Sequence, residues 1–215
     1  MGNPVWQIED WLSAIAFVKS LELINAGKIA LWGTSYSGGH VLVAASRTEG
    51  ISAIVSQVPF VDQLDFIFQK SIKYLIRFIL SAIRVIVGRM VFEKPFYIPV
   101  VGKPDSFAIL NTPECYDGYM GFIPKGTVWD NKITPGGLLW PYRPIRVVRK
   151  ISCPVLIVCA KNDSLASERV IRRTANRVKK CELIIRPINH FEIYSGKPFE
   201  EIIRIEAEFL CRSLL

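Results

Sequence analysis

Ser35 lies in a sequence pattern that favours a nucleophilic serine. It is the centre of the run 33–37 (GTSYS), which follows an apolar run at 28–32 (KIALW) and precedes an apolar helical pattern at 40–46 (HVLVAAS). A nucleophile on a sharp strand-to-helix turn needs small residues two positions before and after it, because the backbone there is strained. The pattern therefore predicts that the Ser35 hydroxyl is lifted out of the end of a strand, ready to attack an acyl carbon.

The residues that follow Ser35 could stabilise the negative charge that such an attack creates. The Tyr36 N–H lies at the predicted start of the helix, where partial positive charge favours an oxyanion, so it is our candidate oxyanion donor. Ser37 also has small neighbours at Ser35 and Gly39 and is the alternative nucleophile. We favour Ser35 because Gly33 directly follows the predicted strand.

A serine nucleophile needs a base, and the chain contains two histidines. His190 lies in the run 187–191 (PINHF), directly after a predicted strand at 182–186, and so at the same sheet edge as Ser35. His40 follows Ser35 by five residues in an apolar helix, which points it elsewhere and predicts a packed side chain. His190 is therefore the candidate base.

The base needs a carboxylate that orients its ring, and two aspartates compete for this role. Asp163 follows a predicted strand at 154–160 (PVLIVCA) and precedes His190 by 27 residues. An aspartate in this place can also be a simple helix cap, a task that Ser164 or Ser167 could share. Asp62, just after a predicted strand at 51–58, is the alternative acid.

The elements that must position these residues predict an α/β fold. The four strands read as continuous apolar runs and alternate with helical patterns at 5–26, 40–46, 167–179 and 198–214. Such a pattern is typical of a mostly parallel sheet with helices on both faces, in which functional residues follow the carboxyl ends of strands. We expect 1–59 and 151–215 to form this core.

Residues 60–150 are irregular and basic, and we interpret them as an inserted lid over an apolar pocket. They are rich in aromatic residues, Phe92 among them, and hold +6 of the net charge of +8. The segment 71–92 is long enough to span a bilayer, but its charged residues Lys73, Arg77 and Arg84 argue against insertion. We expect an amphipathic helix, and we favour a helix that covers its own core over one that contacts a membrane peripherally.

Composition excludes several classes of function. The basic residues are concentrated in the middle of the chain, which argues for a local surface feature and against a nucleic-acid-binding protein. Five cysteines without a CxxC pair, and an N-terminus unlike a signal peptide, indicate a cytoplasmic protein. Two histidines exclude a multi-histidine metal site, and no phosphate loop or nucleotide fingerprint is present, so we expect neither metal nor cofactor.

The order Ser35, Asp163, His190 resembles the alpha/beta-hydrolase superfamily, whose triad follows that order. The segments 7–11, 29–41, 56–59, 153–163 and 190–192 are similar to dienelactone-hydrolase-like and peptidase-S15-like members, including fungal polyketide-processing thiohydrolases or acyltransferases. The resemblance implies a serine hydrolase that cleaves ester, thioester or amide bonds of a small acyl substrate through an acyl-enzyme. Acyl transfer by the same triad, or a weakly active or inactive relative that acts as a binding protein, are the alternatives.

The sequence departs from this family at its beginning. Family members have several more strands before the first helix seen here, and a loop among them supplies a second oxyanion N–H. Their absence would leave the edge of strand 28–32 unpaired, an arrangement that proteins normally cover, and would weaken the oxyanion site. Three interpretations stay open: a fragment of a longer chain, a sheet edge covered by an oligomer partner or second chain, and a triad of reduced activity.

Overall fold

The structure is a computed structural model that describes residues 3–91, 96–135 and 140–215. Its contacts divide the chain into two compact units. The first comprises Met1–Pro4 and Phe66–Pro141, and the second comprises Val5–Asp65 and Tyr142–Leu215. We call the second the sheet unit and the first the 66–141 unit. Apart from Met1–Pro4, the 66–141 unit lies within the predicted insertion, 60–150, whose role as a lid stays a prediction.

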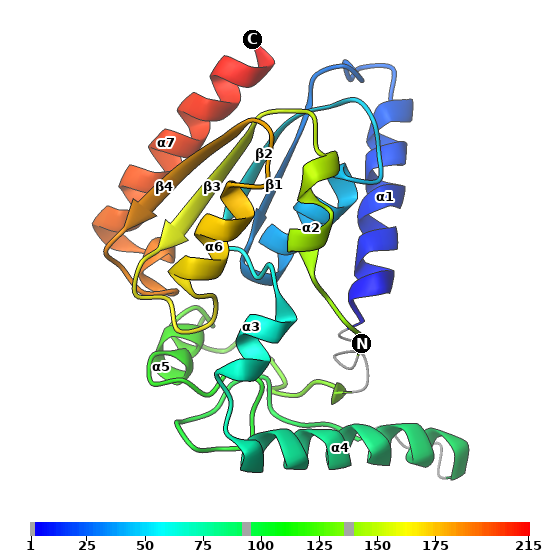
Figure 1. The fold of residues 1–215 in the computed structure, drawn as a ribbon, viewed down its shortest axis with the longest axis vertical. Helices are drawn as coiled ribbons and strands as arrows, with labels where there is room; N and C mark the ends of the chain where they lie inside the picture. The colour runs from blue at the N-terminus through cyan, green and yellow to red at the C-terminus, as the bar shows by residue number, and fades with distance from the viewer. Residues whose placement is uncertain (1–2, 92–95, 136–139) are drawn as a thin grey trace. The chain divides into compact units, whose positions relative to one another are not determined.

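The sheet unit is built on a four-stranded parallel sheet in the order β1-β2-β3-β4 (Figure 1). The α/β fold predicted from the sequence is therefore confirmed. Its strands are β1 (Ile29–Thr34), β2 (Ile51–Gln57), β3 (Val155–Ala160) and β4 (Cys181–Arg186). The longer helices of this unit are α1 (Pro4–Ser20), α2 (Ser35–Ala45), α6 (Glu168–Ala175) and α7 (Gly196–Leu214). Short 3₁₀ turns are η2 (Pro144–Arg146), η3 (Val148–Lys150) and η4 (Glu192–Tyr194).

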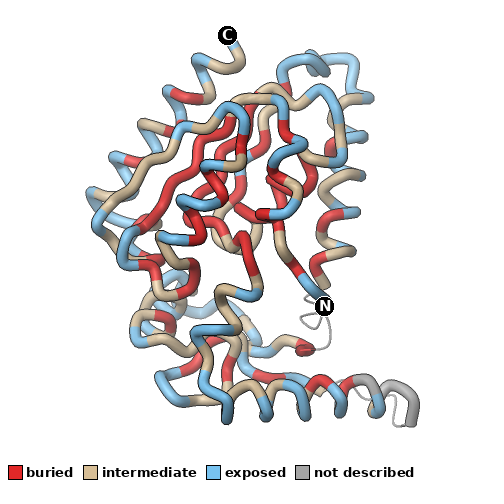
Figure 2. Tube along the Cα trace, in the orientation of Figure 1, coloured by how far each residue is buried: buried red, intermediate tan, exposed pale blue. Residues whose placement is uncertain are grey.

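Apolar residues cover the sheet on both faces. One cluster joins the sheet to α1, α2 and α6 through residues such as Ile15, Leu42 and Ile171, and a second joins it to α7 through Ile202 and Phe209. In Figure 1, α7 lies behind the strands while α2 and α6 lie in front of them. All six residues of β3 are buried, as expected for a central parallel strand (Figure 2).

Several element boundaries differ from the sequence prediction. Helix α2 begins at Ser35 and not at residue 40, and α6 ends at Ala175 and not at residue 179. The helix predicted over 5–26 ends at Ser20, whose hydroxyl donates to the Phe17 carbonyl at 2.7 Å. Leu23 is 98% exposed, so the apolar residues beyond Ser20 do not pack on the core. The helix predicted for residues 21–26 was therefore wrong. Strand β1, in contrast, continues through Gly33 to Thr34, because both residues pair with the end of β2.

The 66–141 unit contains α4 (Ile72–Val91) and α5 (Cys115–Met120), and α3 (Gln63–Phe68) leads into it. Tyr74 of α4 donates its hydroxyl to the Ala108 carbonyl at 2.8 Å and so ties the helix to its own unit. The predicted helix at 71–92 is thus present up to Val91, while Phe92 lies outside the described residues. Within the described ranges, no helix is long and apolar enough to cross a membrane.

Candidate active site

Ser35 is the first residue of α2, directly after the last residue of β1. Its backbone has φ of 53°, a left-handed conformation that costs a non-glycine residue about 1–3 kcal/mol. A Cβ at Gly33 would lie 2.5 Å from the Ser37 carbonyl oxygen, so the tight turn requires glycine there. The strand-turn-helix context predicted for Ser35 is therefore present, with the strain located on the serine itself.

Ser35, His190 and Asp163 form a continuous line of hydrogen bonds. The Ser35 hydroxyl lies 3.0 Å from His190 Nε2, and His190 Nδ1 lies 2.7 Å from Asp163 Oδ2. Both His190 and Asp163 are buried. This geometry allows the imidazole to take a proton from the hydroxyl while a carboxylate accepts from its other nitrogen.

The loop after β3 fixes the orientation of Asp163. The Asp163 Oδ1 atom accepts hydrogen bonds from the Leu165 N–H at 2.7 Å and the Ala166 N–H at 3.0 Å. The other carboxylate oxygen is thereby left to face His190. Capping of α6 falls instead to Ser167, whose hydroxyl accepts from the Val170 N–H.

Asp62, the alternative acid, is occupied elsewhere. Its two carboxylate oxygens accept from Arg143 Nε at 2.7 Å and from the terminal nitrogen Nη2 at 2.8 Å. Oδ1 also accepts from the Leu64 N–H at 3.1 Å. The structure therefore brings Asp163 and not Asp62 to His190, and Asp62 joins the end of β2 to the segment that returns from the 66–141 unit.

The first turn of α2 presents backbone N–H groups that its cap residue does not satisfy. N–H groups in the first turn of a helix have no intrahelical acceptor, and the Thr34 side chain makes no capping hydrogen bond. Its hydroxyl instead lies 2.6 Å from the Tyr194 hydroxyl and accepts from Gln57 Nε2 at 3.0 Å. Tyr36 thus occupies the helix position at which an N–H can donate to an oxyanion.

His40, as predicted, is a packed helix residue. Its Nδ1 lies 2.6 Å from the Tyr142 hydroxyl and its Nε2 lies 3.2 Å from Gln7 Oε1. The ring packs edge-on against Tyr36 with centroids 4.6 Å apart, and burial lowers the pKa of His40 from 6.5 to about 4. A neutral His40 therefore joins α1 and α2 to Tyr142 beside the candidate oxyanion donor.

Tyr142 was missed by the sequence analysis. The nearby signal was the glycine pair after Ser37: a Cβ at Gly39 would lie 2.6 Å from the Tyr142 hydroxyl and 2.2 Å from the Phe60 carbonyl oxygen. That pair predicts close packing but does not identify the partner, which lies more than a hundred residues along the chain.

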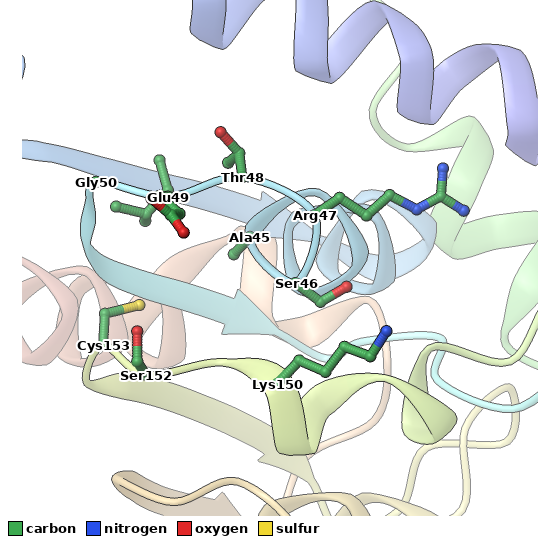
Figure 3. Close-up of a pocket in the computed structure, with 10 residues that line it drawn as sticks. Ala45, Ser46, Arg47, Thr48, Glu49, Gly50, Lys150, Ser152 and Cys153 are labelled. Carbon is green, nitrogen blue, oxygen red and sulfur yellow. The ribbon is translucent and has the colours of Figure 1, made fainter.

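A pocket of about 510 Å³ lies away from these residues (Figure 3). Its lining includes Ile51, the first residue of β2, and Cys153, which lies two residues before β3, whereas Ser35 follows the carboxyl end of β1. Arg47, Glu49 and Lys150 give it a polar, charged lining. This pocket is therefore not the space in which the Ser35 hydroxyl could meet a substrate.

Comparisons with known proteins agree with this architecture. The sequence model of the X-Pro dipeptidyl-peptidase (S15) family matches residues 3–78, the part that contains α1, Ser35 and α2. The quorum-quenching protein AidA of Acinetobacter baumannii is 32% identical over 208 residues, which cover 96% of this chain and 68% of AidA. The chain belongs to the alpha/beta-hydrolase superfamily. It is shorter than this relative.

More distant members of the superfamily extend the likeness over almost the whole chain. A polyketide transferase of Aspergillus fumigatus is 24% identical, over 99% of this chain and 73% of the transferase. The crystal structure of the alpha/beta hydrolase GrgF from a Penicillium species has a TM-score of 0.76 at 22% identity, and it covers 99% of this chain and 73% of GrgF. The structural likeness supports the fold, and the relatives as a group include hydrolases and transferases.

Proposed function

We propose that the protein is a serine hydrolase that cleaves an ester, thioester or amide bond of a small acyl substrate through an acyl-enzyme. The observation that carries this proposal is the line of hydrogen bonds from the Ser35 hydroxyl through both nitrogens of His190 to Asp163. A hydroxyl on a strained turn, a buried imidazole and an oriented carboxylate are the three parts that nucleophilic acyl transfer needs.

The proposed reaction has two halves. In the first, Ser35 Oγ attacks the acyl carbon while His190 Nε2 takes the hydroxyl proton, and the Tyr36 N–H donates to the oxyanion that forms. His190 then gives this proton to the leaving group, the bond to the leaving group breaks, and the acyl group stays on Ser35. In the second half, water attacks the acyl-enzyme with His190 again as base, which releases the acid and restores the hydroxyl. Asp163 stabilises the protonated imidazole in both halves.

Acyl transfer to an alcohol or amine is the second candidate. It is favoured by the likeness to a polyketide transferase, which extends over nearly the whole chain. The same residues would act, and an alcohol or amine would replace water in the second half. Product analysis with competing nucleophiles distinguishes the two: a transferase forms a new ester or amide, while a hydrolase releases mainly the free acid.

A fluorophosphonate probe tests whether Ser35 is a nucleophile. We expect the wild-type chain to be labelled and Ser35→Ala to be unlabelled, because the probe reacts with activated serines. Ser37→Ala is the matched control, since Ser37 lies two residues away and was the alternative nucleophile; it should keep its labelling. Equal labelling of wild type and Ser35→Ala would overturn the proposal. A folded wild-type chain that is not labelled at all would favour a non-catalytic binding protein.

A further inference from the structure

Helix α4 carries an apolar stripe that faces solvent. The isoleucines, leucine and valine that form it recur at spacings of one, three and four residues and therefore lie on one face of the helix. Each of these side chains is between 49% and 74% exposed, which is unusual for residues of this type. The stripe consists of Ile72, Ile76, Ile79, Leu80, Ile83 and Val87.

A different face of α4 holds the helix to its own unit. Ala82 and Val85 are buried, and the Tyr74 hydroxyl donates to the Ala108 carbonyl. In a helix with 100° between residues, these three positions lie on the side away from the stripe. The exposed stripe is therefore not needed to attach α4 to the 66–141 unit, and another role must explain it.

A row of positive charge borders the stripe on one side. Lys73, Arg77 and Arg84 lie next to the apolar face at helical spacing, and α4 contains no acidic residue. None of the described residues forms an ion pair with these three. The two guanidinium groups lie over aromatic rings, Arg77 over Phe107 at 4.5 Å and Arg84 over Phe96 at 4.8 Å, and no carboxylate of the described residues compensates their charge.

We propose that α4 is a docking helix for the surface of an anionic phospholipid membrane. An apolar stripe bordered by lysine and arginine is the pattern by which a helix lies in the plane of a bilayer, with its apolar side chains at the headgroup boundary. Anionic headgroups complement the positive charge of Lys73, Arg77 and Arg84. A second copy of α4 fits less well, because it would bring the same positive charge and no carboxylate to meet it.

Vesicle sedimentation tests the proposal with the full chain. We expect the protein to bind vesicles of phosphatidylcholine mixed with phosphatidylserine far more tightly than vesicles of phosphatidylcholine alone, and to be released by salt. The double variant Ile76→Asp/Ile83→Asp should lose this binding. Val128→Asp is the matched control, because Val128 is 98% exposed and lies outside α4; it should bind like wild type.

The basic row has its own test. Each lysine or arginine near an anionic surface contributes about 1 kcal/mol, so Lys73→Gln/Arg77→Gln should bind roughly 30-fold more weakly. Lys125→Gln, an exposed lysine outside α4, should leave binding unchanged. A melting curve of each variant shows whether it is folded. Ser35→Ala should bind vesicles as wild type does, so failure of membrane docking and failure of the proposed hydrolase function can be distinguished.

Three results would overturn the proposal. One is a wild-type chain that does not bind anionic vesicles. The second is binding that the Ile76→Asp/Ile83→Asp variant retains in full. The third is a wild-type dimer in sedimentation velocity that this variant dissociates without any vesicle binding, which would assign the stripe to a second copy of the chain.

Discussion

Replacing Asp163 with asparagine should abolish most activity without unfolding the protein. The side-chain oxygen of the asparagine can still accept from the Leu165 and Ala166 N–H groups, as Oδ1 of the aspartate does. Its side-chain nitrogen then faces His190 Nδ1, where Asp163 Oδ2 lies at 2.7 Å. Because that nitrogen donates, it favours the tautomer with hydrogen on Nε2, which cannot accept the Ser35 proton. Loss of the correct tautomer costs about 10⁴-fold in kcat, or about 5 kcal/mol in the activation free energy.

Hydrolysis of p-nitrophenyl esters measures this loss, and Asp62→Asn is its matched control. Asp62 is also a buried aspartate after a strand, but it binds Arg143, so its replacement should lower thermal stability and leave kcat nearly unchanged. The reasoning is refuted if Asp163→Asn, with a wild-type melting curve, keeps kcat within tenfold of wild type. It is equally refuted if folded Asp62→Asn loses as much activity as Asp163→Asn.

Two further substitutions test the packing around Ser35. Gly39→Ala should lower the free energy of unfolding, measured by urea denaturation, by about 1–3 kcal/mol, because its Cβ would lie 2.2 Å from the Phe60 carbonyl oxygen. Gly27→Ala is the control. Its Cβ would lie 3.3 Å from the nearest atom, so it should have a much smaller effect on the free energy of unfolding. Between pH 7 and pH 5 the free energy of unfolding should fall by about 2 kcal/mol through His40, because the unfolded chain takes up a proton near pH 6.5 while folded His40, with a pKa of about 4, does not. His40→Asn should remove that part of the pH dependence, and an unchanged pH dependence would contradict a buried neutral His40.

The strands of the sheet were predictable because each is a short apolar run. The predicted strands at 51–58, 154–160 and 182–186 differ by one residue at an end from β2, β3 and β4. Parallel strands with both faces covered need apolar residues at nearly every position. Such a strand can therefore be recognised from its own sequence, without knowing which strands and helices it packs against. The positions of Ser35, Asp163 and His190 after their strands follow from the same signal, since the carboxyl ends of parallel strands share one edge.

Features that depend on distant partners were not predictable. The spacing of apolar residues predicted that the first helix continues to residue 26, whereas α1 ends at Ser20. Spacing alone does not reveal that Leu23 is exposed and packs against no core. Likewise, the sequence left Asp62 and Asp163 as alternatives, since both follow strands. The choice between them depends on Arg143, which lies 81 residues from Asp62 and whose charge occupies its carboxylate. The local pattern thus identifies both aspartates as candidate acids, and the partner that each one binds shows which of them can orient His190.

The strain on Ser35 depends on this long-range packing as well. A left-handed serine persists only when its surroundings stabilise that conformation by more than the strain costs. Here the Phe60 N–H donates to the Ser35 carbonyl at 2.9 Å. Helix α2 approaches the same segment so closely that a Cβ at Gly38 would lie 3.0 Å from the Gln57 carbonyl oxygen and one at Gly39 only 2.2 Å from the Phe60 carbonyl oxygen. The contacts that hold α2 against residues 57–60 therefore also hold the hydroxyl toward His190. A substitution such as Gly39→Ala should for this reason weaken fluorophosphonate labelling of Ser35 although it touches no residue of the proposed triad.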